Sequence, residues 1–170
     1  MLHFAAEPAG WMNLYRYVDG KAEQVTDLEA ELAGPDWQFG YSTYEFLPGG
    51  DILAIARSSC RDELIRIGRS GAISTIELPY TEMNSLSVDG DRVLLLGAGP
   101  KQPAQIVELD LDGSIEVLRN ANPNRPDPED VSIPRHIEFP TTGDRTAFGT
   151  TTPRPIAPSP ARPASCRRSS

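Results

Sequence analysis

Few residues of this chain could supply acid, base or nucleophilic chemistry, and they lie far apart. The two histidines, His3 and His136, have no nearby serine or cysteine pattern that would pair a nucleophile with its base. The segment closest to a Gly-x-Ser-x-Gly nucleophile turn is GYSTY, in which Tyr44 replaces the second glycine. Ser42, the serine of this segment, is therefore interpreted as a loop residue at the start of a strand.

Metal and phosphate motifs are also incomplete. ELDLDG, from Glu108 to Gly113, alternates acidic residues but fits a strand followed by an Asp-Gly turn, and it lacks the rest of a calcium loop. LGAGP, from Leu96 to Pro100, lacks the GxGxxG spacing that holds a phosphate. The sequence therefore predicts no catalytic, metal-binding or cofactor-binding residue, and no cofactor.

Aromatic residues form one candidate ligand surface between positions 11 and 46. For these aromatic residues we favour packing, in the core and between neighbouring repeats, over ligand binding, because large aromatic side chains dominate such contacts. They are Trp11, Tyr15, Tyr17, Trp37, Phe39, Tyr41, Tyr44 and Phe46.

The charge of the chain is distributed unevenly. The net charge is −8, and all 24 acidic residues lie before Gly149. An acidic body argues against a nucleic-acid partner, since phosphate binding needs a basic face. The basic residues near the C-terminus lack interleaved aromatic residues and an amphipathic period, which argues against a nucleic-acid or membrane arm. They are Arg154, Arg162, Arg167 and Arg168.

Other features indicate a cytoplasmic protein. The chain has no apolar run of about 18 residues that could span a membrane, and its N-terminus lacks the features of a secretory signal. Cys60 and Cys166 make no disulfide framework, which suits a reducing compartment. We expect no membrane partner.

The body of the chain is a repeat. Residues 42–79 and 85–119 each contain four short β-type runs in the same order, separated by turns rich in glycine and aspartate. Corresponding runs are about 42 residues apart, within the range of a four-stranded propeller blade. The runs are Tyr44–Leu47, Ile52–Ala56, Leu64–Ile67 and Ile73–Leu78, then Leu86–Val88, Arg92–Leu96, Ile106–Leu109 and Ile115–Leu118.

The N-terminus matches the same template without its first strand, so the chain is expected to start inside a repeat. The predicted fold class is all-β, a partial β-propeller of about two and two-thirds four-stranded antiparallel blades. An open arc leaves blade edges exposed, through which the chain could self-associate. The predicted parts are an incomplete blade (1–30), two blades (31–80 and 81–122), a connector with strands (123–149) and a disordered tail (150–170).

Several segments resemble the prolyl oligopeptidase family of serine peptidases, of the dipeptidyl aminopeptidase or acylaminoacyl-peptidase type. The resemblance extends from about Leu2 to Phe148. It implies an N-terminal propeller that restricts substrates to short peptides, followed by an α/β-hydrolase domain. Residues 133–149 resemble the first strands of that domain. The segments are GWMNLYRYVDG, GPDWQFGYSTYEFLPGG, ELPYTEMNSLSVDGDRVLLLGAG and SIPRHIEFPTTGDRTAFG.

The family's catalytic serine, aspartate and histidine lie further along the chain than this sequence extends, so no catalytic residue is carried over. The sequence thus predicts a non-catalytic propeller fragment, resembling the substrate-gating domain of such a peptidase, and not an enzyme as it stands. The partners that the family implies are short peptides and a hydrolase domain. The alternatives are a free-standing module for binding or assembly, and half of a split peptidase completed in trans.

The last 21 residues break the apolar pattern. If the codons for residues 150–170 are read in the frame that starts one base earlier, they can encode Tyr-Tyr-Pro-Pro-Ala-Asn and later Glu-Leu-Pro-Pro-Leu. These segments resemble the sequence that follows this point in members of the family. This favours the hypothesis that the tail is an out-of-frame product. The alternative is a functional proline-rich tail, since PRPIAPSPARP could form polyproline II and dock on an aromatic groove.

Overall fold

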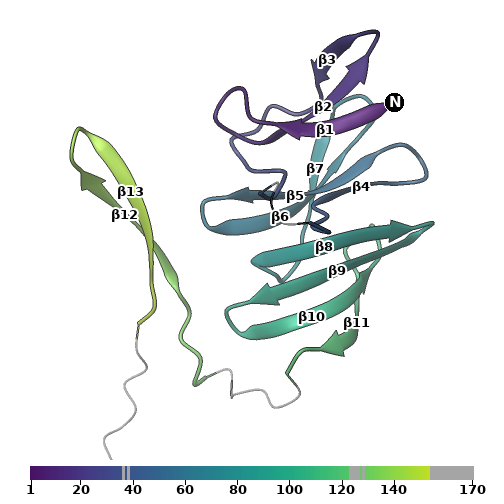
Figure 1. Cartoon of the computed structure of the whole chain (residues 1–170). Helices are drawn as coiled ribbons and strands as arrows, with labels where there is room; N and C mark the ends of the chain where they lie inside the picture. The colour runs from purple at the N-terminus through teal and green to yellow at the C-terminus, as the bar shows by residue number, and fades with distance from the viewer. Residues whose placement is uncertain (36, 38, 123–126, 128, 154–170) are drawn as a thin grey trace, which may run out of the picture. The chain divides into compact units, whose positions relative to one another are not determined.

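The computed structural model describes residues 1–35, 37, 39–122, 127 and 129–153, and it is drawn in Figure 1. Among these residues the regular structure is entirely β-strand, in 13 strands. The chain divides into two compact units, Met1–Arg125 and Pro126–Ser170.

The first unit consists of three antiparallel sheets, each formed from strands that follow one another in the chain (Figure 1). Each predicted run falls on a strand at least in part: several strands are longer than predicted, whereas the runs that end at Leu47 and Leu78 extend beyond their strands. Sheet 1 contains β1 (Leu2–Ala6), β2 (Asn13–Val18) and β3 (Lys21–Gln24). Sheet 2 contains β4 (Tyr44–Phe46), β5 (Ile52–Ser58), β6 (Arg61–Ile67) and β7 (Ile73–Ile76). Sheet 3 contains β8 (Glu82–Asp89), β9 (Arg92–Gly99), β10 (Gln102–Leu109) and β11 (Ile115–Asn120).

Two-residue turns determine the register of several hairpins. The β2–β3 turn has Asp19 and Gly20 at φ 49° and 81°, the left-handed region that a type I′ turn requires at both positions. The β5–β6 turn reaches the same region with Ser59 and Cys60, at φ 48° and 60°. Both turns therefore match the right-handed twist of the two strands that they join.

Sheet 2 lies between the other two sheets and is covered on both faces. Because its two faces are both buried, β5 is buried at five successive positions, from Ile52 to Ala56. One core cluster joins sheet 1 to sheet 2 through Leu14, Leu32, Ala54 and Ile65, among others. The other joins sheet 2 to sheet 3 and includes Leu53, Ile55, Leu64, Met83, Leu95 and Val107.

The first strands of sheets 2 and 3 run beside each other. Residues of β4 contact residues of β8, and the backbone N–H of Leu86 donates to the carbonyl of Ser42 (3.1 Å). The stacking of successive sheets through apolar faces is the arrangement that the repeat predicts.

The second unit contains one hairpin, β12 (Arg135–Thr141) paired with β13 (Arg145–Thr151). His136 lies on β12, within the segment predicted as a connector with strands, and its ring stacks on that of Phe148 (5.7 Å between ring centroids). The tail predicted for 150–170 lies outside the described residues from Arg154 onward.

Candidate functional site

Ser42 and His3 line one hollow without forming a catalytic pair. The single hydroxyl proton of Ser42 has two acceptors within reach, Glu45 Oε1 (3.1 Å) and the carbonyl oxygen of Tyr44 (3.3 Å). The ring of His3 lies edge-on against Phe46, 4.8 Å between centroids. In the part of the chain that the structure describes, no hydrogen bond joins Ser42 to His3. A triad places histidine between serine and carboxylate, and here Ser42 contacts the Glu45 carboxylate directly, without a histidine between them.

The surroundings of His3 favour the neutral form of its imidazole. Burial lowers the pKa of His3 below its usual value of 6.5, and the positive charges of the N-terminus and Arg16 lower it further. A neutral imidazole packs well beside aromatic rings, and among the described residues no carboxylate is paired with His3 to orient it as a base.

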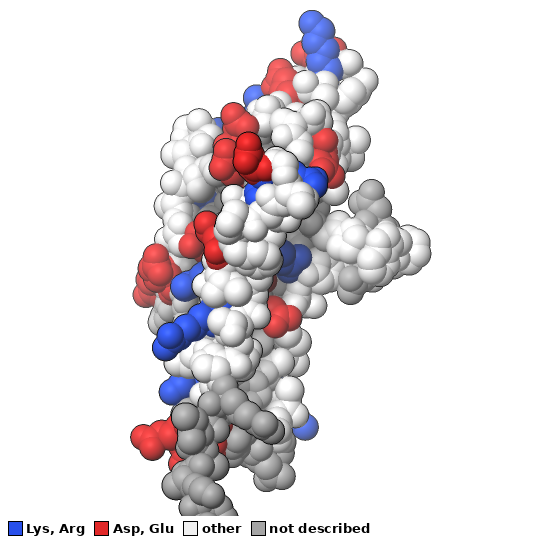
Figure 2. All heavy atoms as spheres, turned by 90° about the vertical axis from the view of Figure 1, so that its left-hand side faces the viewer, with Lys and Arg blue, Asp and Glu red and all other residues white. Residues whose placement is uncertain are grey.

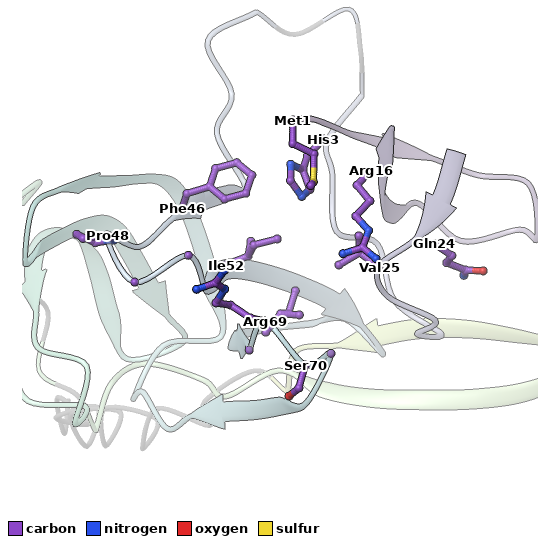
Figure 3. Close-up of a pocket in the computed structure, with 15 residues that line it drawn as sticks. Met1, His3, Arg16, Gln24, Val25, Phe46, Pro48, Ile52, Arg69 and Ser70 are labelled. Atoms are coloured by element: carbon purple, nitrogen blue, oxygen red, sulfur yellow. The ribbon is translucent and has the colours of Figure 1, made fainter. Parts of the chain in front are cut away.

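A hollow of about 650 Å³ separates sheet 1 from the turns of sheet 2 (Figure 3). Arg16 points into it from β2 and Arg69 from the β6–β7 turn, and no carboxylate lines it. Arg16 is paired with Glu23 (2.8 Å), and Asp51 accepts a bond from the Arg69 backbone N–H (3.2 Å). The hollow thus has room for a ligand beside two basic side chains, and its described lining residues include no carboxylate.

A second hollow, of about 680 Å³, lies between β1, β4 and residues of the 33–42 segment. Its lining includes Phe39, 95% exposed, together with Tyr44 and Phe46. The expectation that the aromatic cluster packs in the core is therefore wrong for part of it: Trp37 and Phe39 are almost fully exposed. Tyr44 does pack against the core between sheets 1 and 2.

A polar network ties sheet 2 to sheet 3. Arg57 Nε donates to Asp62 Oδ1 (3.1 Å), and Arg57 Nη2 donates to Asn84 Oδ1 (2.8 Å) and to the carbonyl of Met83 (2.9 Å). Tyr41 donates its hydroxyl to Asn84, and its ring lies 5.2 Å from the Arg57 guanidinium carbon. Sequence reasoning missed this network because its members are up to 43 residues apart.

The remaining motifs fall on hairpins. Asp112 accepts bonds from the backbone N–H (3.0 Å) and hydroxyl (2.6 Å) of Ser114, so the ELDLDG segment is a strand end and turn, as expected. These bonds lower the pKa of Asp112. LGAGP ends β9, and exposed Cys60 occupies the β5–β6 turn. Cys166 lies outside the described residues.

The described residues offer neither a cluster of metal ligands nor a membrane-spanning helix. Within the described ranges, no three His, Cys, Asp or Glu side chains gather as metal ligands would. No described helix is of the length and apolarity that crossing a bilayer requires. On the face drawn in Figure 2, acidic and basic side chains are interspersed.

Comparison with solved structures identifies the fold. Neither a family model nor a curated protein sequence matches the chain. It is similar to a puromycin-hydrolyzing peptidase of Mycobacterium tuberculosis (26% identity, TM-score 0.78, 86% of this chain and 23% of that one). It is also similar to a puromycin hydrolase (28%, TM-score 0.75, with the same shares covered). The chain resembles part of the propeller of prolyl oligopeptidase-family peptidases.

The propeller match confirms the predicted fold class and the predicted resemblance. Dipeptidyl peptidase 4 of Porphyromonas gingivalis shares the fold, with 13% identity and a TM-score of 0.62. The chain spans less than a quarter of the length of these peptidases, and the match does not cover their catalytic domain. The three sheets of the first unit match a fragment of such a propeller.

Proposed function

We propose that this chain supplies blades to the propeller of a prolyl oligopeptidase-family serine peptidase and carries none of its catalytic groups. In that role the blades form part of a wall that admits short peptides to a hydrolase domain. The observation that supports this proposal most strongly is the similarity to the puromycin-hydrolyzing peptidase over 86% of the chain.

The polar side chains support a non-catalytic role. A serine peptidase needs a nucleophile hydrogen-bonded to a histidine, and an oxyanion site beside it. Here Ser42 bonds directly to Glu45, and His3 packs against Phe46. The chemistry of the family would come from a hydrolase domain, and these blades would restrict access to it.

An activity assay tests the non-catalytic role. The purified chain is incubated with aminoacyl-naphthylamide and dipeptidyl-naphthylamide substrates, and separately with a fluorophosphonate probe that labels activated serines. We expect no product above buffer and no labelling, with Ser42→Ala identical to the unmodified chain. Turnover or labelling that Ser42→Ala abolishes would contradict the proposal.

A further inference from the structure

The 650 Å³ hollow between sheet 1 and the turns of sheet 2 has positively charged walls. Arg16 points into it from β2 and Arg69 from the β6–β7 turn, and its described lining residues include no carboxylate (Figure 3). Arg16 lies on the middle strand of sheet 1 and Arg69 lies in sheet 2, so neither position depends on the outer edge of β1. The hollow is thus a candidate site for an anion.

Arg69 has a guanidinium group that no described residue pairs with. Asp51 accepts a hydrogen bond from the backbone N–H of Arg69 (3.2 Å), but its carboxylate is paired with the side chain of Arg66 (2.7 Å). No ion pair or side-chain hydrogen bond joins the Arg69 guanidinium to a residue that the structure describes. Its N–H donors, which a guanidinium presents in a fixed fork, are therefore available to a ligand.

Arg16 contributes a further donor but little net charge. Its Nε and Nη2 both donate to Glu23 Oε2, at 2.9 Å and 2.8 Å, so this carboxylate offsets most of its charge. Among the described residues, Nη1 of Arg16 has no hydrogen-bond partner. The described walls thus hold one unpaired positive charge, that of Arg69, and a second guanidinium that can bond a ligand. This arrangement fits a singly charged anion better than a doubly charged one.

Two tight turns add backbone donors beside the arginines. In Leu47–Gly50 and in Gly68–Gly71, the N–H of the fourth residue donates to the carbonyl of the first (2.8 Å in both turns). The third residues, Gly49 and Ser70, line the hollow, and within the described part of the chain their N–H groups make no hydrogen bond. Backbone N–H groups in turns commonly form anion sites, so these groups favour the same kind of ligand.

The hollow also has an apolar floor, which consists of Val25, Ile52 and Ile67. The same three residues belong to the core between sheets 1 and 2. The volume of about 650 Å³ lies within the range of sites for small organic molecules and far exceeds that of an inorganic ion. A ligand that fills this space therefore needs an apolar body as well as a charged group.

We propose that the hollow binds an organic carboxylate with an apolar body, whose carboxylate lies between Arg16 and Arg69 and whose apolar part lies on the apolar floor. A guanidinium fork matches the two oxygens of a carboxylate. A phosphate dianion fits less well, because the described walls hold one unpaired positive charge. The proposal does not rest on the peptidase role, so either can fail while the other stands.

The first test uses N-acetyl-leucine, a carboxylate with an apolar side chain, and N-acetyl-leucinamide, which has the same shape without the charge. Each is titrated into the full chain and followed by NMR at the backbone amides. N-acetyl-leucine should cause saturable shifts at Gln24, Ser70 and Gly71 but not on β11, and the amide should cause none. Equal binding of the two compounds, or shifts confined to other parts of the chain, would overturn the proposal.

Two further probes define the class of anion. Inorganic phosphate that bound at the same amides more tightly than N-acetyl-leucine would overturn the choice of a carboxylate. Octanoate distinguishes two sources of that carboxylate, and both of its outcomes support the proposal. Weaker binding than that of N-acetyl-leucine would indicate the C-terminus of a peptide, and tighter binding would indicate a fatty acid.

Arg69→Gln removes the unpaired charge. We expect the affinity for N-acetyl-leucine to fall by about tenfold, the effect of losing a hydrogen bond to a charged group. The matched control is Arg61→Gln, since Arg61 is also exposed, lies at the opposite end of β6 and forms no ion pair with a described residue. The two variants lower the net charge equally, so an equal loss of affinity would show general attraction and would overturn the proposal.

Ser70→Asp and Ser70→Asn test the charge of the hollow while both arginines stay in place. Ser70 is exposed in the β6–β7 turn, so both variants should fold even if Arg69→Gln does not, which circular dichroism verifies. The two new side chains have the same size, and aspartate alone repels an anion. We expect Ser70→Asp to bind N-acetyl-leucine about threefold more weakly than Ser70→Asn does. Equal affinities of these two variants would overturn the proposal.

Discussion

Arg57 on β5 and Asn84 on β8 are hydrogen-bonded across two neighbouring sheets, with 2.8 Å between Nη2 and Oδ1. The same guanidinium holds the carboxylate of Asp62, whose side chain is only 9% exposed and which also accepts a bond from the Met83 N–H (2.7 Å). One side chain thus pairs a nearly buried charge within sheet 2 and links that sheet to sheet 3.

We expect Arg57→Ala to lower the free energy of unfolding by about 3 kcal/mol, because it leaves the Asp62 carboxylate without its cation in a nearly buried position. Urea unfolding followed by circular dichroism measures this change. The matched control is Arg16→Ala, which breaks an exposed pair with Glu23 and should cost about 0.5 kcal/mol. Equal losses in the two variants would contradict the role given to Arg57.

Gly97 on β9 should tolerate no side chain. A Cβ at this position would lie 2.6 Å from ring atoms of Tyr80, which is 2% exposed and donates its hydroxyl to Gln105 (3.0 Å). We expect Gly97→Ala to destabilise the fold by about 2 kcal/mol, the usual effect of overpacking a core. Gly99→Ala, two residues along the same strand, meets only ordinary contacts at 3.6 Å and beyond, and its midpoint of thermal unfolding should barely move.

The β5–β6 turn offers a stabilising change. Ser59 and Cys60 both have positive φ, where Asn-Gly is the preferred pair for a type I′ turn. Replacing them with Ser59→Asn and Cys60→Gly should stabilise the chain by about 1 kcal/mol. Gly20→Ala places a side chain at φ 81° in the β2–β3 turn, and this change should instead destabilise the chain. Thermal melts of the three proteins give the order, and no gain from Asn-Gly would contradict the turn assignment.

Asp51 should contribute to the dependence of stability on pH. The Arg66 side chain (2.7 Å) and the Arg69 N–H bond its carboxylate and lower its pKa below 3.8. A carboxyl group whose pKa is lower in the folded chain than in the unfolded chain stabilises the fold at pH values above its unfolded-chain pKa. This stabilisation is lost as the pH falls through its folded-chain pKa. The melting temperature should therefore drop below about pH 4.

Asp51→Asn should show a smaller drop over the same pH window, because it removes one of the groups that change protonation there. The same sign applies to Glu108, whose pKa Arg92 lowers through two hydrogen bonds. If the melting temperatures of Asp51→Asn and of the unmodified chain fell by the same amount from pH 6 to pH 3, the contact between Asp51 and Arg66 would contribute nothing to the stability of the fold, and the prediction would be wrong.

The strands were predictable from local signals. Short runs of apolar and β-branched residues between turns that contain glycine and aspartate placed β5 and β9, and the shared spacing revealed the repeat. The strands extend further than the patterns because hairpin pairing continues into polar residues, as at Arg61 on β6 and Gln102 on β10.

The contacts between sheets were not predictable in this way. Arg57 meets Asn84, and Gly97 meets Tyr80, only after the sheets stack, and no sequence period records such pairs. Nor does an aromatic residue reveal which sheet face it will occupy, so the exposure of Phe39 was missed. The hollow beside β1 depends on which neighbouring strands are present, which a single repeat does not specify.

The most direct measurement for the central claim is the DNA sequence on both sides of this coding region, read from independent template. If the chain supplies blades to a family peptidase, the upstream frame should encode further four-stranded repeats. The frame one base back should continue downstream into a hydrolase domain with a Gly-x-Ser-x-Gly turn. Flanks without blade repeats and without that pentad in any frame would contradict the claim.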